Sequence, residues 1–420
     1  MRKTISIAAI SVLAGVSPGW AADSVELEKQ VQELARQNRL LLERVISLEK
    51  MVAGQASSAA DRAAEAGTEG AEEQAPANAP EAVAGKESSA AGESLPHRLS
   101  EHIELSGLVE VEAFTAKDFA GGETSDITLA TVALHLDAEP ADWSRAHIVL
   151  LYEEGEEDEH VIIDEATVTL GKLDAYPAYL SVGRMYLPFG SFATNMISDT
   201  LPLELGEISD AAVLAGFESG GLQGALYAFH GDIRENGESG KIDNWGAGLH
   251  YVREGETFSC DAGLGWLNNI GDTDGLGDYL EENTAANEMD DYVAGLAGHM
   301  LLGYGPVDFT AEYVRALDRF KAAEISFADG GAEPEAWSFE LGLNFELLAR
   351  ETILSVGYQG TAEAYALGLP QIRYLTGIRM YLLKNVSLAL EYLHDEDYGI
   401  SAGGTGDDAR AGTVQLAVAL

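Results

Sequence analysis

The sequence has one cysteine, few basic residues and no long apolar segment beyond its first twenty residues. Cys260 alone cannot form an intrachain disulfide or a cysteine-based zinc site. Lys and Arg number 25 against 70 Asp and Glu, which gives a net charge of -45. Nucleic acid is therefore excluded as a partner, because binding it requires a basic surface. An ordinary membrane-spanning helix is excluded too, since it needs about 18 or more consecutive apolar residues.

Glycine and acidic residues are what the sequence has in excess. Glycine accounts for 46 of 420 residues, above the usual share of about 7%. Apolar residues make up 46% of the chain, which is enough for a folded protein rather than a disordered one. This composition favours a large β protein, either a soluble one or an outer-membrane barrel.

The first 21 residues have the pattern of a bacterial secretory signal peptide. Arg2 and Lys3 precede a short apolar stretch over residues 5–16, and Pro18 is followed by small residues near Ala21. The apolar stretch is too short for a membrane anchor. We therefore expect residues 1–21 to direct export of the chain to the cell envelope.

Residues 24–52 predict a short coiled coil. Leucine recurs every seven residues, with valine or asparagine at the interleaved positions: Leu27, Leu34, Leu41 and Leu48, and Val31, Asn38, Val45 and Val52. Leucine at d and valine at a favour a parallel dimer, and Asn38 would fix the register. The alternative is a single amphipathic helix. Residues 53–96 contain almost no large apolar residue and predict a flexible acidic linker.

Residues 97–420 are dominated by alternation with a period of two. In residues 337–347, one face carries Trp337, Phe339 and Leu341, and the other carries Glu340 and Glu346. Such segments are about ten residues long, the length that a tilted strand needs to cross a bilayer. Seven short turns and eight longer loops separate them. The fold class predicted is all-β, a sixteen-stranded antiparallel transmembrane β-barrel. A soluble sandwich or propeller is the alternative.

The inward face of such a barrel lines a water-filled channel. With the apolar face turned to lipid, eleven acidic residues, two arginines and three histidines are predicted to face the lumen: Glu104, Glu110, Glu112, Asp137, Glu153, Glu165, Asp308, Glu312, Glu340, Glu346, Glu391, Arg373, Arg379, His135, His147 and His250. Each carboxylate alone is most simply a solvated lumen residue. Together they predict a field that favours cations.

Residues 190–210 form a long loop that is unusually apolar. Phe192, Leu201 and Leu205 are among the apolar side chains that something must cover. We expect the loop to fold into the barrel and narrow it, with its polar residues facing the constriction: Asn195, Asp199, Glu204, Glu207 and Asp210. Packing at a subunit interface is the alternative.

The residues offer one candidate metal site and no catalytic one. Asp272, Asp274 and Asp278 lie in a glycine-rich loop and could bind Ca²⁺ through oxygen ligands, although solvated acidic loops are commoner. No other cofactor is expected. A nucleophile elbow, a phosphate loop and a His-Glu zinc helix are all missing, so an enzyme is not expected.

One stretch of the sequence resembles a known family. The run V-G-R-M-Y-L-P-F-G over residues 182–190, continued by residues 192–199 and by L-E-L-G-E over residues 203–207, is similar to the signature of the LbtU-type siderophore porins. The order of signal peptide, coiled coil, linker and barrel is similar as well. The resemblance implies an outer-membrane porin that takes up iron-siderophore complexes without a plug domain.

The sequence thus predicts a porin in contact with outer-membrane lipid that carries ferric siderophores. The alternatives are a general diffusion porin for small cationic solutes and a structural protein that tethers the envelope. The porin interpretation predicts a homotrimer, whereas the coiled-coil composition favours a dimer.

Overall fold

The computed structural model describes residues 102–154, 160–173, 175–237, 240–255, 257–284 and 287–420. The expected signal peptide (1–21), coiled coil (24–52) and linker (53–96) lie outside these residues. Among the described residues, no helix is both long and apolar enough to cross a membrane.

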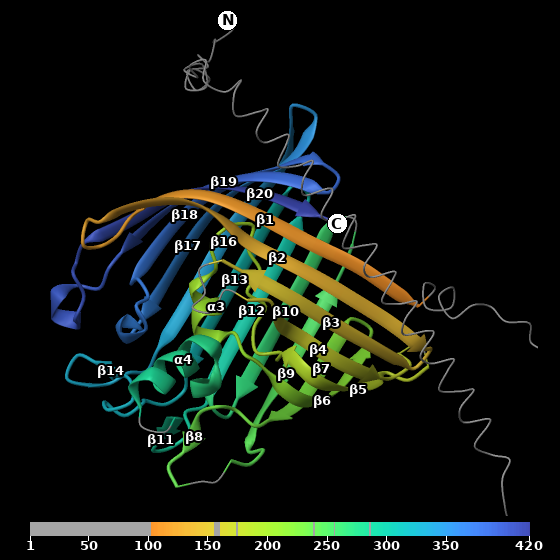
Figure 1. Ribbon diagram of the computed structural model, residues 1–420, viewed down its shortest axis with the longest axis horizontal. Helices are drawn as coiled ribbons and strands as arrows, with labels where there is room; N and C mark the ends of the chain where they lie inside the picture. Colours follow the sequence, from red (N-terminus) through yellow and green to blue (C-terminus); the bar gives the residue numbers. More distant parts are fainter. Residues whose placement is uncertain (1–101, 155–159, 174, 238–239, 256, 285–286) are drawn as a thin grey trace, which may run out of the picture. The chain divides into compact units, whose positions relative to one another are not determined.

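Sixteen antiparallel strands form a closed barrel (Figure 1), which confirms the predicted strand number and fold class. Pairing of β1 with β20, from Leu108↔Ala419 to Lys117↔Arg410, closes the ring. The barrel strands are β1 (Ile103–Lys117), β2 (Glu123–Ala141), β3 (Ser144–Glu153), β4 (Ile162–Leu170), β5 (Ala178–Tyr186), β6 (Ser209–Ser219), β7 (Leu222–Phe229), β9 (Asn244–Arg253), β10 (Phe258–Leu267), β12 (Gly295–Tyr304), β13 (Val307–Ala316), β16 (Glu335–Leu347), β17 (Arg350–Ala362), β18 (Ile372–Leu383), β19 (Val386–Glu396) and β20 (Asp408–Ala419).

The alternation of the sequence determines which side chains point outward. In β16, Phe339 and Leu341 are exposed at 44% and 49%, while Glu340 between them is exposed at only 4%. Successive side chains of a strand point to opposite faces of the sheet. The outer surface is therefore apolar along this strand, as a lipid-facing wall requires, and the polar side chains face inward.

Short turns and long connections alternate around the barrel, as the sequence predicts. The turn between β16 and β17 contains Leu348 and Ala349, which have φ of 54° and 58°. Gly220 and Gly221, with φ of 60° and 84°, connect β6 and β7. Two central residues with positive φ are typical of tight hairpin turns whose twist matches that of the strands.

The long connections add short elements to the barrel. Helix α3 (Leu201–Gly206) contacts β13, β16 and β17, and Figure 1 shows it inside the ring of strands. Buried apolar side chains of α3 and α4 belong to one core cluster with inward residues of the wall. The remaining elements are η1 (Ile270–Asp272), α4 (Asp274–Asn283), η3 (Tyr365–Leu367), η4 (Ile400–Ala402), and two small sheets formed by β8 (Arg234–Glu235) with β11 (Glu288–Met289) and by β14 (Ser326–Phe327) with β15 (Gly330–Gly331).

Candidate functional site

Residues 187–208, called here the inserted segment, connect β5 to β6 through the interior of the barrel. Two paired glycines, Gly248 of β9 and Gly265 of β10, allow its first residues to approach the wall. A Cβ at Gly248 would stand 2.8 Å from the carbonyl oxygen of Pro188, and one at Gly265 would stand 2.8 Å from Cα of Phe189. A side chain at either position would force the segment away from the wall.

Three buried glutamates hold the inserted segment against the opposite wall. Glu312 of β13, Glu340 of β16 and Glu391 of β19 are exposed at 4%, 4% and 6%. Each of these carboxylates accepts hydrogen bonds from backbone N–H groups of the segment. Hydrogen bonds to a charged acceptor are stronger than neutral ones, and they offset the cost of burying the charge.

The contacts follow the segment in order along the wall. Glu312 accepts from the N–H groups of Ser191 at 2.8 Å and Phe192 at 2.6 Å. Glu340 accepts from the Asn195 backbone N–H at 3.0 Å and from its side-chain amide at 2.7 Å, and also from the Thr194 hydroxyl.

Glu391 and Gln359 hold the tip of the segment and the start of α3. Glu391 accepts from the Ile197 N–H at 2.6 Å and from the Ser198 hydroxyl. Gln359 of β17 accepts from the Leu201 N–H at 2.9 Å. Helix α3 then begins with Thr200 as its N-cap and Pro202 in its first turn.

Two arginines of β18 hold the carbonyl groups of the same segment. Arg379 donates to the carbonyl of Met196 at 3.2 Å, and Arg373 donates to that of Asp199 at 3.3 Å. Arg373 also forms a two-point ion pair with Asp395, with distances of 2.9 and 3.0 Å. Its guanidinium therefore connects the inserted segment to two strands of the wall.

The predicted lumen residues fall into three groups by exposure. Glu312, Glu340 and Glu391 lie on the inner face but are covered by the inserted segment, which corrects the expectation that they line the channel as solvated acids. Glu104, Asp137, Glu153 and Glu346 are exposed, and the others are partly buried. Among the latter, Glu112 accepts from Gln415 at 2.9 Å, Asp308 accepts from Asn344, and Glu165 lies 4.0 Å from His147.

The sequence predicts that the polar residues of the loop face the constriction, but not all of them do. Asn195 turns to the wall and donates to Glu340, and Asp210 belongs to β6 and accepts from the Gly231 N–H at 3.0 Å. Glu207 is partly buried; burial and nearby acids, Asp274 first, raise its pKa to about 7. Asp199 and Glu204 are exposed. Surrounding protein reduces their hydration and raises the pKa of both, which Arg373 opposes.

The three predicted calcium ligands line one small cavity of about 110 Å³, together with Asp210 and Asp232. Asp272 faces the protein and accepts N–H bonds from Asp232 at 2.9 Å and Ile233 at 2.8 Å, while burial raises its pKa to about 7. Within the described part of the chain, the three aspartates do not bring their oxygens together at one point. Calcium binding here stays a prediction.

One group of metal-ligating side chains does converge. His250, Asp261 and His299 place one ligand atom each within 4.8 Å of one another, the only such group among the described residues. The sequence pattern places His250 inward, but the group depends on strand register, which the pattern leaves open. Gln359 and the Arg373–Asp395 pair were missed for the same reason.

Comparison with known sequences gives relatives of modest identity. No family model matches the chain. A UPF0422 protein of Coxiella burnetii is 28% identical over 312 residues, covering 72% of this chain and 66% of the relative. A UPF0422 protein of Legionella pneumophila (strain Lens) is 29% identical over 320 residues, covering 71% and 60%. The chain thus spans less than two thirds of the length of these relatives.

Comparison with solved structures identifies the fold as that of outer-membrane porins. The outer membrane channel DcaP of Acinetobacter baumannii matches with a TM-score of 0.52, 14% identity and coverage of 76% of this chain and 97% of that one. An anion-selective porin from Comamonas acidovorans matches with a TM-score of 0.52, 13% identity and coverage of 76% and 99%. Pseudomonas putida OprB matches with a TM-score of 0.53, 9% identity and coverage of 76% of this chain and 95% of that one. The resemblance to LbtU-type porins stays a prediction.

Proposed function

We propose that the protein is an outer-membrane diffusion channel whose aperture is set by the inserted segment. The observation that carries this proposal is the attachment of the segment to the inner wall through Glu312, Glu340 and Glu391. A segment held by charge-assisted hydrogen bonds along several strands keeps a fixed position, so the space that it leaves open has a defined width.

For the solute, we propose ferric siderophores. The stretch that resembles the siderophore porins, residues 182–207, comprises the end of β5 and nearly the whole inserted segment. The sequence that carries the resemblance is therefore the part of the chain best placed to select solutes. This supports a shared solute class rather than only a shared barrel.

General permeation of small cations is the second candidate. Asp199 and Glu204 are exposed on the inserted segment, and Glu104 and Glu346 are exposed on the wall. Exposed carboxylates in a pore favour cations. The burial of Glu312, Glu340 and Glu391 weakens this field, because their charges are already used by backbone N–H groups. The envelope-tethering alternative depends on residues 24–96, outside the described part.

Two experiments separate these functions. Deletion of the gene should slow growth on a ferric siderophore under iron limitation, and the intact gene should restore growth. Unchanged growth together with reduced permeability to small cations would favour the general porin. In planar bilayers, deletion of residues 195–207 should raise single-channel conductance; unchanged conductance would contradict the role of the segment as the constriction.

The remaining proposals concern assembly. Contact with outer-membrane lipid is supported by the apolar outer surface, with Leu264 exposed at 63% and Leu226 at 62%. A homotrimer is proposed on the porin fold, and its mass in detergent is the test. Measurement with and without residues 24–52 distinguishes a barrel interface from a coiled-coil interface, and a monomer in both forms rejects the proposal.

A further inference from the structure

Three neighbouring strands bring two histidines and an aspartate together on the inner wall. In β10, Gly263 pairs with His250 of β9 on one side and with His299 of β12 on the other. Because Gly263 has no side chain, the imidazole of His299 can occupy the space above it; a Cβ there would stand only 2.9 Å from Nε2 of His299. Asp261, two residues along β10, lies on the same face.

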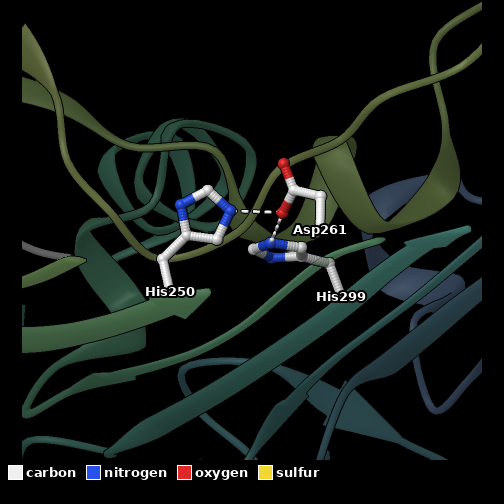
Figure 2. A group of neighbouring side chains, drawn as sticks. All are labelled: His250, Asp261 and His299. Atoms are coloured by element: carbon white, nitrogen blue, oxygen red, sulfur yellow. Dashed lines mark hydrogen bonds and ion pairs between the residues drawn. The ribbon is translucent and has the colours of Figure 1, made fainter. Parts of the chain in front are cut away.

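The ligand atoms of this group point at one place. Nε2 of His250 and Nε2 of His299 both contact the same oxygen, Oδ1 of Asp261, the latter at 3.2 Å. Figure 2 shows both rings directed at the same carboxylate oxygen. In a tetrahedral site with bonds of about 2.0–2.1 Å, ligand atoms stand roughly 3.3 Å apart. An ion that forms bonds of this length fits among the three ligand atoms after small movements of the side chains.

The group is partly shielded and still reachable from the lumen. The side chain of His299 is exposed at 9%, that of His250 at 32% and that of Asp261 at 33%. Both histidines line a cavity of about 360 Å³ that Pro188 and Gly190 of the inserted segment also line. Asp261 lines a second cavity of about 330 Å³. The strands fix the ligands, and each ligand residue lines one of the two cavities.

We propose that His250, Asp261 and His299 form a binding site for a divalent first-row transition-metal ion such as Zn²⁺. Imidazole nitrogens with one carboxylate suit this class, whereas Ca²⁺ and Mg²⁺ prefer oxygen ligands alone. Three protein ligands leave a coordination position open for water or for a donor from the lumen. The site is independent of which solute the channel carries.

The test uses the full chain without a histidine tag, purified in detergent and freed of metal with a chelator. Zinc is titrated calorimetrically in excess Ca²⁺, which occupies the acidic surface, and Co²⁺ is added separately because its visible spectrum reports tetrahedral coordination. We expect one equivalent bound. Asp261→Asn and His299→Gln each should weaken binding at least about tenfold.

The matched control is His147→Gln. His147 lies 2.7 Å from Asp137 and 4.0 Å from Glu165 on the inner wall, but it belongs to no converging group among the described residues. This variant should bind zinc as the unmodified protein does. A folded, unmodified barrel without stoichiometric binding would overturn the proposal, and so would an Asp261→Asn variant with undiminished affinity. Either result would mean that the three side chains only form hydrogen bonds between neighbouring strands.

Discussion

Two parts of the inner wall carry similar acidic side chains and use them differently. On the wall from β13 to β19, Glu312, Glu340 and Glu391 are buried beneath the inserted segment. On the wall from β1 to β4, Asp137 and Glu165 keep 52% and 26% of their side chains exposed, beside histidine rather than backbone N–H groups. Inward carboxylates therefore hold the inserted segment in place on the first wall, whereas on the second wall they are charges that face the lumen.

The difference lies in what faces each carboxylate. A buried charge is tolerated where several hydrogen bonds replace its water, and the inserted segment supplies them through consecutive N–H groups. No such backbone reaches Asp137 and Glu165 among the hydrogen bonds of the described residues. Counting inward acids therefore overestimates the charge that a permeating ion meets.

The largest loss of stability in the wall beneath the inserted segment is expected when Arg373 is replaced. Its ion pair with Asp395 has side-chain exposures of 15% and 9%. Loss of one partner of a buried pair costs about 3–5 kcal/mol, and we expect the lower end because the lumen is partly hydrated. Arg373→Gln should lower the unfolding midpoint in detergent. Asp395→Asn in the same chain should recover part of the loss, and absence of any recovery would contradict the pairing.

Removal of Glu340 should release the inserted segment without unfolding the barrel. Glu340→Ala leaves the Asn195 N–H, its amide and the Thr194 hydroxyl without their acceptor, at a cost of about 1–3 kcal/mol for an unsatisfied buried group. We expect faster hydrogen exchange over residues 190–201 and noisier single-channel currents. Glu346→Ala is the matched control, since Glu346 lies on the same strand and face but is exposed. Equal effects of the two variants would contradict the conclusion that Glu340 holds the inserted segment in place.

Local patterns in the sequence predict the barrel strands, but they do not predict where the inserted segment packs against them. Alternation over residues 337–347 identifies the inward face of β16, and the positions of the connections give the number of strands. Whether Glu340 is solvated depends on where a segment about 145 residues earlier is placed, as its contact with Asn195 shows. The α3 signals, Thr200 and Pro202, are present in the sequence, but six residues are too few to give a helical period.

A third prediction concerns η1 and the start of α4, where Asp272 lies. Burial raises the pKa of Asp272 from 3.8 to about 7. Between about pH 4 and pH 7 the native state keeps a proton that the unfolded chain has lost, so stability falls as pH rises through this window. Given its partial exposure, we expect a change on the order of 1–2 kcal/mol. Hydrogen-exchange protection factors around residues 268–284, which correct for the faster intrinsic exchange at higher pH, should be larger at pH 5 than at pH 8.

Asp272→Asn is the variant that checks this dependence. The amide oxygen can still accept from Asp232 and Ile233, and only the contact with the Asn269 amide is lost. The pH dependence should flatten. If Asp272, Asp274 and Asp278 bind Ca²⁺, millimolar Ca²⁺ should stabilise this region at pH 8 more than at pH 5, because the ion prefers ionised carboxylates. No effect of Ca²⁺ at pH 8 would reject the calcium prediction.

The smallest effect is expected for ion selectivity, where the two walls can be compared directly. Asp199→Asn with Glu204→Gln removes exposed charge from the inserted segment, and Asp137→Asn with Glu165→Gln removes it from the wall of β2 and β4. Both pairs should lower cation preference in reversal-potential measurements under a KCl gradient. The first pair should act more strongly if the inserted segment forms the constriction, because permeating ions then pass closest to it. The difference should fade toward 1 M salt, where the Debye length is about 3 Å. Anion preference of the unmodified channel at low salt would contradict the cation assignment, and equal shifts from the two pairs would place the narrowest point away from Asp199 and Glu204.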